Sequence, residues 1–246
     1  MKIGFLSDIH GNYDALQVAL SNFSERNVDE IICLGDIVGY GAEPGKCVDE
    51  ISRRAKIVIA GNHDWASVGK TDITYFNRYG REAILWTSEV LMPHQRSFLA
   101  NLKLSHFDSN WCAVHSTPHE PSRWQYIFSS SDALRQFEYF DRKICLIGHS
   151  HIPGVFTDKG DHIQISIPFD ESETIVKILG DRRYIVNIGS VGQPRDNDVR
   201  GSIVVYDTEA EVINFIRFFY PVPQAQKKIL SAGLPRFLAD RLEQGI

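Results

Sequence analysis

Residues 3–10 read IGFLSDIH, a short apolar run that passes directly into an aspartate and a histidine. Four further apolar runs in the chain also pass into polar residues that can bind metal. Runs this short, rich in Ile and Val and bounded by Gly or polar residues, are typical of buried strands. The five runs are Ile3–Leu6, Ile31–Leu34, Ile57–Ala60, Trp111–Val114 and Ile144–Ile147.

Helical patterns lie between the first three of these predicted strands. Tyr13–Arg26 and Pro44–Arg54 carry apolar residues at near-helical spacing, and Pro44 suits a first helical turn. Alternation of strands and helices predicts parallel pairing with right-handed crossovers. The expected fold class is therefore α/β, with helices covering a sheet.

A longer helical stretch, Ile73–Asn101, shows no strand signal, and Pro93 is expected to open a second short helix that ends near Leu102. Aromatic stripes at helical spacing belong more often to the core than to a ligand site. Because this stretch follows Asn62 and His63, the alternative is that about residues 71–102 form a lid. The stripe comprises Phe76, Tyr79, Ala83, Trp86 and Val90.

Beyond His151, short strands and turn-like Asp/Gly segments replace the helical patterns. We expect a second sheet packed on the first, followed by a polar helical tail over Pro223–Ile246. Because no repeat, low-complexity run or long linker interrupts the chain, residues 1–246 are interpreted as one domain. The later strands are expected at Val155–Thr157, His162–Ile167, Thr174–Ile178, Tyr184–Ile188, Ser202–Asp207 and Val212–Phe218.

The composition argues against several classes of protein. The chain carries 26 basic and 31 acidic residues, a net charge of −5. The overall charge therefore does not favour binding to nucleic acid or to an anionic membrane. No stretch approaches the roughly 18 apolar residues of a membrane span, and the N-terminus lacks a signal-peptide core. Three of the four cysteines lie within apolar runs, which predicts buried thiols and a reduced, cytoplasmic setting.

Metal-binding residue types gather at the carboxyl ends of the predicted strands, where open α/β sheets bind ligands. Five of the nine histidines fall there, beside two aspartates and an asparagine. Buried carboxylates are costly unless they are paired, so this edge is expected to bind cations. The residues are Asp8, His10, Asp36, Asn62, His63, His115, His149 and His151.

In their order along the chain, these residues resemble the motifs of the calcineurin-like metallophosphoesterases. The motifs are Asp8-x-His10, Gly35-Asp36, Gly61-Asn62-His63-Asp64, His115 and Gly148-His149-Ser150-His151. The stretch NIGSVGQPR at residues 187–195 is most similar to the small prokaryotic phosphodiesterase branch, which usually has Pro where Ile188 stands. The resemblance implies a four-layer α/β/β/α sandwich with two packed mixed sheets and a helical lid segment.

The resemblance also implies a centre of two divalent transition-metal ions joined by Asp36. Manganese is the first expectation, and Fe, Ni, Co and Zn also accept mixed imidazole and carboxylate ligands. A hydroxide that bridges the ions would attack the phosphorus. The implied ligands are Asp8, His10, Asp36 and His151 for one ion, and Asp36, Asn62, His115 and His149 for the other.

Four further residues are candidates for catalysis or substrate binding. His63 is expected to donate a proton or hydrogen bond to the leaving oxygen, and Asp64 either orients His63 or simply opens a helical turn. Asn12 either contributes to substrate binding or caps the helix that begins near residue 13. Arg195 either reaches a substrate phosphate or is a surface arginine in a turn.

The expected function is hydrolysis of a phosphodiester or phosphoanhydride of a small molecule or nucleotide by a metal-dependent phosphoesterase. A nuclease is the closest alternative, although no basic run extends beyond Arg53-Arg54, Arg182-Arg183 and Lys227-Lys228. A non-catalytic scaffold on the same fold is the other alternative, and the presence of every ligand type and of His63 argues against it. The sequence predicts no oligomeric state.

Overall fold

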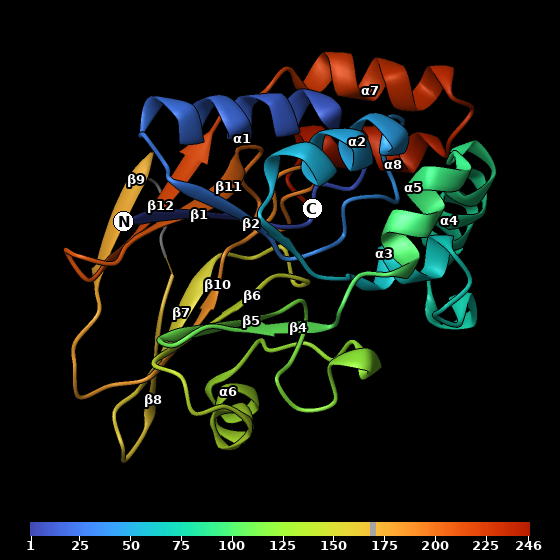
Figure 1. Ribbon diagram of the computed structural model, residues 1–246. Helices are drawn as coiled ribbons and strands as arrows, with labels where there is room; N and C mark the ends of the chain where they lie inside the picture. The colour runs from blue at the N-terminus through green and yellow to red at the C-terminus, as the bar shows by residue number, and fades with distance from the viewer. Residues whose placement is uncertain (168–170) are drawn as a thin grey trace.

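A computed structural model describes residues 1–167 and 171–246 as two packed sheets with helices outside them (Figure 1). The first sheet has the strand order β3-β2-β1-β11-β12-β9. Strands β1, β2 and β3 pair in parallel, and the other neighbours pair antiparallel. The bounds are β1 Lys2–Leu6, β2 Glu30–Cys33, β3 Ile57–Val58, β9 Glu173–Lys177, β11 Gly201–Asp207 and β12 Val212–Phe218.

The second sheet has the order β4-β5-β6-β10-β7-β8 and is also mixed. Strands β5, β6 and β10 pair in parallel, whereas β4, β7 and β8 join antiparallel at the two edges. The bounds are β4 Ser105–Phe107, β5 Trp111–Val114, β6 Ile144–Ile147, β7 Gly154–Asp158, β8 Ile163–Ser166 and β10 Tyr184–Asn187.

A dry core joins the two sheets. Phe5 of β1 meets Trp111 of β5 edge to face, with ring centroids 5.1 Å apart. Ile32 and Phe215 from the first sheet and Leu146 from the second belong to the same buried cluster. Burial on both faces explains why these strands are nearly continuous apolar runs rather than alternating ones.

Helices cover the outer faces of both sheets. In Figure 1, α1 and α2 lie over the first sheet with α7 and α8, and α6 lies beneath the second. Together with α3, α4 and α5 at one end of the molecule, they confirm the expected α/β/β/α sandwich. The bounds are α1 Tyr13–Glu25, α2 Pro44–Arg54, α3 Asn62–Ser67, α4 Arg78–Val90, α5 Pro93–Ala100, α6 Ser130–Gln136, α7 Val222–Ser231 and α8 Arg236–Asp240.

The region of the predicted lid differs in part from the expectation. A short 3₁₀ turn, η1 (Ile73–Tyr75), precedes α4, and α5 begins at Pro93 as predicted. The aromatic stripe is not a continuous core face, because Tyr79 and Val90 are exposed while Ala83 is buried. The face of α4 that packs inward also carries Ile84.

The short elements β4 and α6 were not predicted, and α3 was expected only as a helical turn opened by Asp64. The predicted strand Ile57–Ala60 also ends early, because β3 stops at Val58 and α3 begins four residues later. All four cysteines are buried and none forms a disulfide, as expected. Across the described part of the chain, no helix combines the length and the apolar character needed to cross a bilayer. The cytoplasmic setting stays a prediction.

Candidate active site

The loops that follow the first strands of the two sheets are tied together by backbone hydrogen bonds. The amide of Asp8 donates to the carbonyl of Gly35 at 3.0 Å, and the amide of His10 donates to the carbonyl of Asp36 at 2.9 Å. In the second sheet, the amide of Gly148 donates to the carbonyl of His115 at 2.9 Å. These ties fix the ends of β1, β2, β5 and β6 at one edge of the sandwich.

The backbone at this edge adopts a conformation that side chains rarely favour. Five of the predicted metal ligands have φ angles between 51° and 67°, in the left-handed region. Non-glycine residues in this region cost free energy and gather at functional sites, where the surroundings hold them in place. The five are Asp8, His10, Asp36, His149 and His151.

These side chains converge in three overlapping buried groups, each with donor atoms within 4.8 Å of one another. Asp36 belongs to two of the three groups, and so does His10. One aspartate therefore lies between two sets of histidines, as a bridging ligand would. The groups are Asp8 with His10 and His151, Asp36 with His115 and His149, and Asp36 with His10 and His63.

The separations inside the cluster are short. Nε2 of His151 lies 3.2 Å from Oδ1 of Asp8, and Nε2 of His115 lies 3.4 Å from Oδ2 of Asp36. Nε2 of His10 lies 3.6 Å from the same Asp36 oxygen. Imidazole nitrogens and carboxylate oxygens thus face one another across a small buried space.

Backbone carbonyls orient the histidine rings. Nδ1 of His10 lies 3.1 Å from the carbonyl oxygen of Val38, and Nδ1 of His115 lies 2.7 Å from that of Leu34. Donation of Nδ1–H to these carbonyls leaves the Nε2 lone pairs directed at the cluster. His149 is turned the other way: its Nε2 contacts the carbonyl oxygen of Trp124 at 2.8 Å, which leaves Nδ1 for a metal.

Several buried polar atoms at this edge lack any hydrogen-bond partner within the described residues. They include Oδ1 of Asp8, Oδ1 of Asn62 and Nε2 of His115. A buried polar atom without a partner costs roughly 1–3 kcal/mol, so a group of them at one point calls for a ligand. Carboxylate, amide oxygen and imidazole form a donor set that suits divalent transition metals. The residues present therefore fit a metal centre.

The charges of the cluster are consistent with this fit. Burial raises the pKa of Asp8 and Asp36, but nearby histidines, above all His151 for Asp8 and His115 for Asp36, bring both values well below the usual range. Burial lowers the pKa of His115, yet the two carboxylates raise it more strongly, to about 9. Burial and His115 lower the pKa of His149 to about 3. Both aspartates are thus ionised and His149 is neutral near pH 7.

His63 lies beside the cluster on α3. Its backbone amide donates to Oδ1 of Asp36 at 2.8 Å, and its ring contacts those of His10 and Tyr40, with centroids 4.8 and 4.4 Å away. Burial lowers the pKa of His63 to about 4, so the ring is neutral near pH 7. Its Nδ1 atom is buried and, among the described residues, has no hydrogen-bond partner.

Among the described residues, Asp64 makes no hydrogen bond to the side chain of His63, so its expected role in orienting His63 stays a prediction. Its oxygens accept backbone amides instead, from Ile37 at 2.9 Å and from Gly61 at 3.0 Å. The bond from Gly61 closes the first turn of α3, so the alternative of a residue that opens a helical turn describes Asp64. Burial and the charge of Asp36 raise its pKa to about 7.

Asn12 and Arg195 lie in different places. Asn12 caps α1: its side-chain oxygen accepts the amide of Ala15 at 3.1 Å, and its side-chain nitrogen donates to the carbonyl of Gly192 at 2.9 Å. It does not line the pocket described below, and its expected substrate contact stays a prediction. Arg195 does line that pocket.

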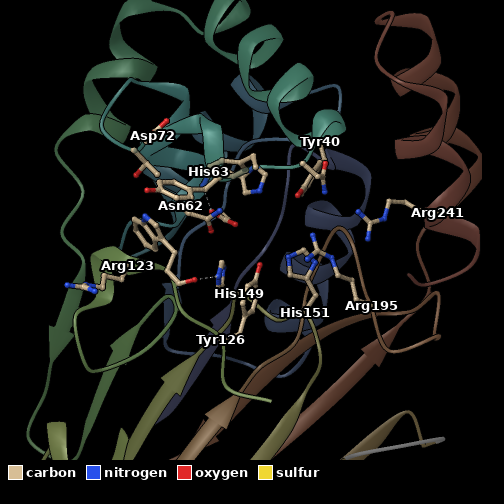
Figure 2. Close-up of a pocket in the computed structure, with 16 residues that line it drawn as sticks. Tyr40, Asn62, His63, Asp72, Arg123, Tyr126, His149, His151, Arg195 and Arg241 are labelled. Atoms are coloured by element: carbon tan, nitrogen blue, oxygen red, sulfur yellow. Dashed lines mark hydrogen bonds between the residues drawn. The ribbon is translucent and has the colours of Figure 1, made fainter. Parts of the chain in front are cut away.

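A cavity of about 520 Å³ opens over the cluster (Figure 2). Asn62, His63, His149 and His151 form part of its floor, and aromatic rings surround them. Tyr126 stacks on the ring of His149 with centroids 4.0 Å apart. The aromatic lining residues are Tyr40, Tyr75, Phe76, Trp124 and Tyr126.

The sequence analysis missed Arg241 and most of this aromatic wall. Arg241 lines the pocket from a 3₁₀ turn, η4 (Arg241–Glu243), in the tail interpreted only as a polar helical segment. No motif or periodicity marks it. Of the wall, only Phe76 belonged to a stripe that was singled out.

Comparisons with known proteins give concordant matches. The model of the calcineurin-like phosphoesterase superfamily domain matches residues 1–211. An uncharacterized protein of Methanocaldococcus jannaschii is 37% identical over 250 residues, which cover 99% of this chain and 98% of that protein. The crystal structure of a metallophosphoesterase from Sphaerobacter thermophilus superposes with a TM-score of 0.90 at 35% identity, covering 100% of this chain and 99% of that one.

A hypothetical protein of Pyrococcus horikoshii shares the fold, with a TM-score of 0.79 at 18% identity over 100% of this chain and 98% of that one. The sandwich and the buried Asp/His cluster define a phosphoesterase with candidate metal-binding residues. The chain belongs to the calcineurin-like phosphoesterase superfamily.

Proposed function

We propose that this phosphoesterase hydrolyses a phosphodiester or phosphoanhydride of a small molecule or nucleotide, using two divalent metal ions. The observation that carries the proposal is the position of Asp36 between two sets of histidines. A carboxylate with one oxygen facing both sets is suited to join two ions. Manganese is the first candidate for both positions.

In this proposal, Asp36 is shared by two sets of ligands. The first set is completed by Asp8, His10 and His151, and the second by Asn62, His115 and His149. When bound, two such ions supply Lewis-acid stabilisation of phosphoryl oxygens and lower the pKa of water. The unpartnered oxygens of Asp8 and Asn62 support these assignments.

The charge balance favours a phosphate anion. Two divalent ions contribute +4 and the carboxylates of Asp8 and Asp36 contribute −2, a local sum of about +2. A site with this charge attracts phosphate even though the whole chain carries −5. Because the ligands are buried, the surrounding water screens this attraction only weakly.

We assign to His63 a hydrogen bond to the leaving oxygen. A Cβ added at Gly39 would lie 2.4 Å from Nδ1 of His63, so that nitrogen packs against the chain. Nε2 is then the atom available to a substrate in the pocket. Because the ring is neutral near pH 7, its N–H stabilises charge on the leaving oxygen as the phosphorus–oxygen bond breaks.

We also keep the expectation that residues 71–102 belong to one domain with the rest of the chain and cover the site as a lid. Thr71, Asp72 and Phe76 line the pocket, which supports this assignment. Phe76 contacts the ring of His63 edge to face, with centroids 4.9 Å apart. Closure by this segment would exclude water from the reacting phosphate.

A hydrolysis panel combined with elemental analysis tests the proposed function. Purified protein, prepared without chelators, is offered bis-p-nitrophenyl phosphate, p-nitrophenyl phosphate and a labelled oligonucleotide. We expect about two ions per chain and faster cleavage of the diester than of the monoester. One ion or none under excess metal would contradict the dinuclear centre. A preference for the monoester would overturn the diesterase assignment, and preferential cleavage of the oligonucleotide would restore the nuclease alternative.

A further inference from the structure

Two arginines face the pocket without a carboxylate side chain to neutralise them. Arg195 follows β10 in the chain, and Arg241 begins the turn after α8. Among the ion pairs of residues 1–167 and 171–246, neither guanidinium contacts an Asp or Glu side chain within 4.0 Å. Arg123, the third arginine of the pocket, differs because it pairs with Glu120 at 3.1 Å.

The two side chains converge on one ring. The guanidinium carbon of Arg195 lies 5.8 Å from the ring centroid of Tyr40, and that of Arg241 lies 5.9 Å from it. Figure 2 shows both side chains extending toward each other beside His151. Segments far apart in the chain therefore place two positive charges on one side of the candidate metal centre.

The hydrogen bonds of the pair leave donors unused. One terminal nitrogen of Arg195 donates to Oε1 of Gln193 at 2.9 Å, whereas its buried Nε has no partner within the described residues. Nε of Arg241 donates to the main-chain oxygen of Ile246. A guanidinium has five N–H donors, so each arginine keeps donors free for a ligand in the pocket.

The two positive charges beside Tyr40 oppose each other. Burial and the positive charge of Arg195 lower the pKa of Arg241 to about 10. Such an arrangement costs free energy in the absence of a counter-ion, and an anion between the guanidinium groups would relieve it. The metal cluster does not supply that anion, since its carboxylates belong to Asp8 and Asp36 and are surrounded by histidines.

We propose that Arg195 and Arg241 form a second anion-binding subsite, which selects substrates that carry a further phosphate beside the scissile one. Arginine forks match phosphate oxygens in geometry as well as charge. The subsite proposal rests on the proposed function for the identity of the scissile group. The binding of the second anion does not depend on that function. Arg241 lies beyond residue 211, where the match to the superfamily model ends.

Equilibrium binding tests the subsite without turnover. The affinity of the metal-loaded protein is measured by calorimetry for thymidine 5′-phosphate, and for two ligands with a second anionic group: thymidine 3′,5′-bisphosphate and the non-hydrolysable α,β-methylene analogue of thymidine 5′-diphosphate. We expect at least one of the latter to bind about tenfold or more tightly than the monophosphate. This gain in affinity over the monophosphate should fall to about twofold or less in Arg195→Gln and Arg241→Gln. Arg241→Lys should retain part of the gain.

The control variant is Arg236→Gln. Arg236 lies on α8, is highly exposed and pairs with Asp240 at 3.3 Å, so its loss should leave the gain as in the unmodified protein. Thermal unfolding of each variant shows whether the fold is retained. Equal affinity for all three ligands, or a gain that survives both glutamine variants, would overturn the subsite.

A pair of chromogenic esters separates this proposal from the proposed hydrolytic function. The p-nitrophenyl ester of thymidine 5′-phosphate, with and without a 3′-phosphate, reports the reaction. Absence of hydrolysis with an arginine-dependent binding gain would refute the proposed function and retain the subsite. Hydrolysis of both esters without any arginine-dependent difference in binding would retain the function and refute the subsite.

Discussion

Oδ2 of Asp36 lies 3.4 Å from Nε2 of His115, while Oδ1 of the same carboxylate accepts the backbone amide of His63 at 2.8 Å. The amide at the start of α3 thus holds one oxygen and leaves the other facing the histidines. This division explains how a single side chain can be both anchored by the fold and available to metal. Its replacement should therefore affect metal binding more than folding.

Asp36→Asn should lower metal content and phosphoesterase activity together. The amide keeps one oxygen for the backbone contact with His63 but removes the negative charge shared between the two ligand sets. Elemental analysis after gel filtration, together with diester hydrolysis, measures both effects. Asp161→Asn is the matched control because Asp161 is exposed and pairs only with the neighbouring His162. Full metal content with lost activity would contradict the bridging assignment.

Gly61→Ala should disturb the same carboxylate from the backbone side. A Cβ at Gly61 would lie 2.1 Å from Oδ1 and 2.3 Å from the backbone nitrogen of Asp36, so the two loops would have to separate. We expect a loss of metal that excess metal restores only in part. Gly180→Ala is the control, because a Cβ there meets no atom within 4 Å. Equal metal content in both variants would show that the loops can move apart at little cost.

The strands and most metal ligands could be predicted from sequence because both depend on short-range pattern. A buried parallel strand is a continuous apolar run, and its last residue marks where a ligand can lie. Asp8 lies two residues after such a run and His115 follows one directly, and both are found at the predicted edge. The positions of the strand ends were therefore sufficient to predict that residues distant in the chain lie near one point.

Other features depend on packing that no local pattern encodes. The capping contacts of Asp64 and Asn12 depend on the positions of the Gly61 and Ala15 amides, which the sequence does not give. The left-handed backbone at Asp8 follows from ties between loops. Arg241 reaches the pocket because the tail folds back across the first sheet, which its own sequence does not reveal.

Asp64→Ala should destabilise the protein through the loop after β2. The substitution leaves the buried amides of Ile37 and Gly61 without their acceptor, which costs about 1–3 kcal/mol of unfolding free energy for each unsatisfied group. Urea denaturation of metal-free protein measures the loss. An unchanged midpoint would show that water replaces the carboxylate at these amides.

Metal binding should release about one proton from the ligand side chains at pH 7.5, in addition to any proton lost by water at the metal centre. His115 carries a raised pKa of about 9 in the metal-free protein and must lose its proton to bind metal, whereas Asp8 and Asp36 are already ionised and His149 is already neutral. Because a raised pKa means that the proton is held up to about pH 9, the apparent metal affinity should rise roughly tenfold per pH unit until that pH and then level off.

Calorimetry in two buffers of different ionisation enthalpy gives the number of protons released. His115→Gln should release about one proton fewer than the unmodified protein, although its affinity also decreases. Release of three or four protons from the unmodified protein would show that His149 and its neighbours are protonated before metal binds, contrary to the effect of burial on their pKa values.

His63→Ala should slow the reaction without removing metal, since His63 is placed beside the leaving group rather than among the assigned ligands. We expect kcat to fall by roughly 10²–10⁴ with metal content retained. The loss should be smallest for a nitrophenol, which departs readily without a hydrogen bond, and largest for an alkyl alcohol, which does not. Metal analysis and steady-state kinetics with both leaving groups decide the matter. If His63→Ala loses metal as Asp36→Asn does, or slows both substrates equally, then the N–H of His63 does not serve the leaving oxygen.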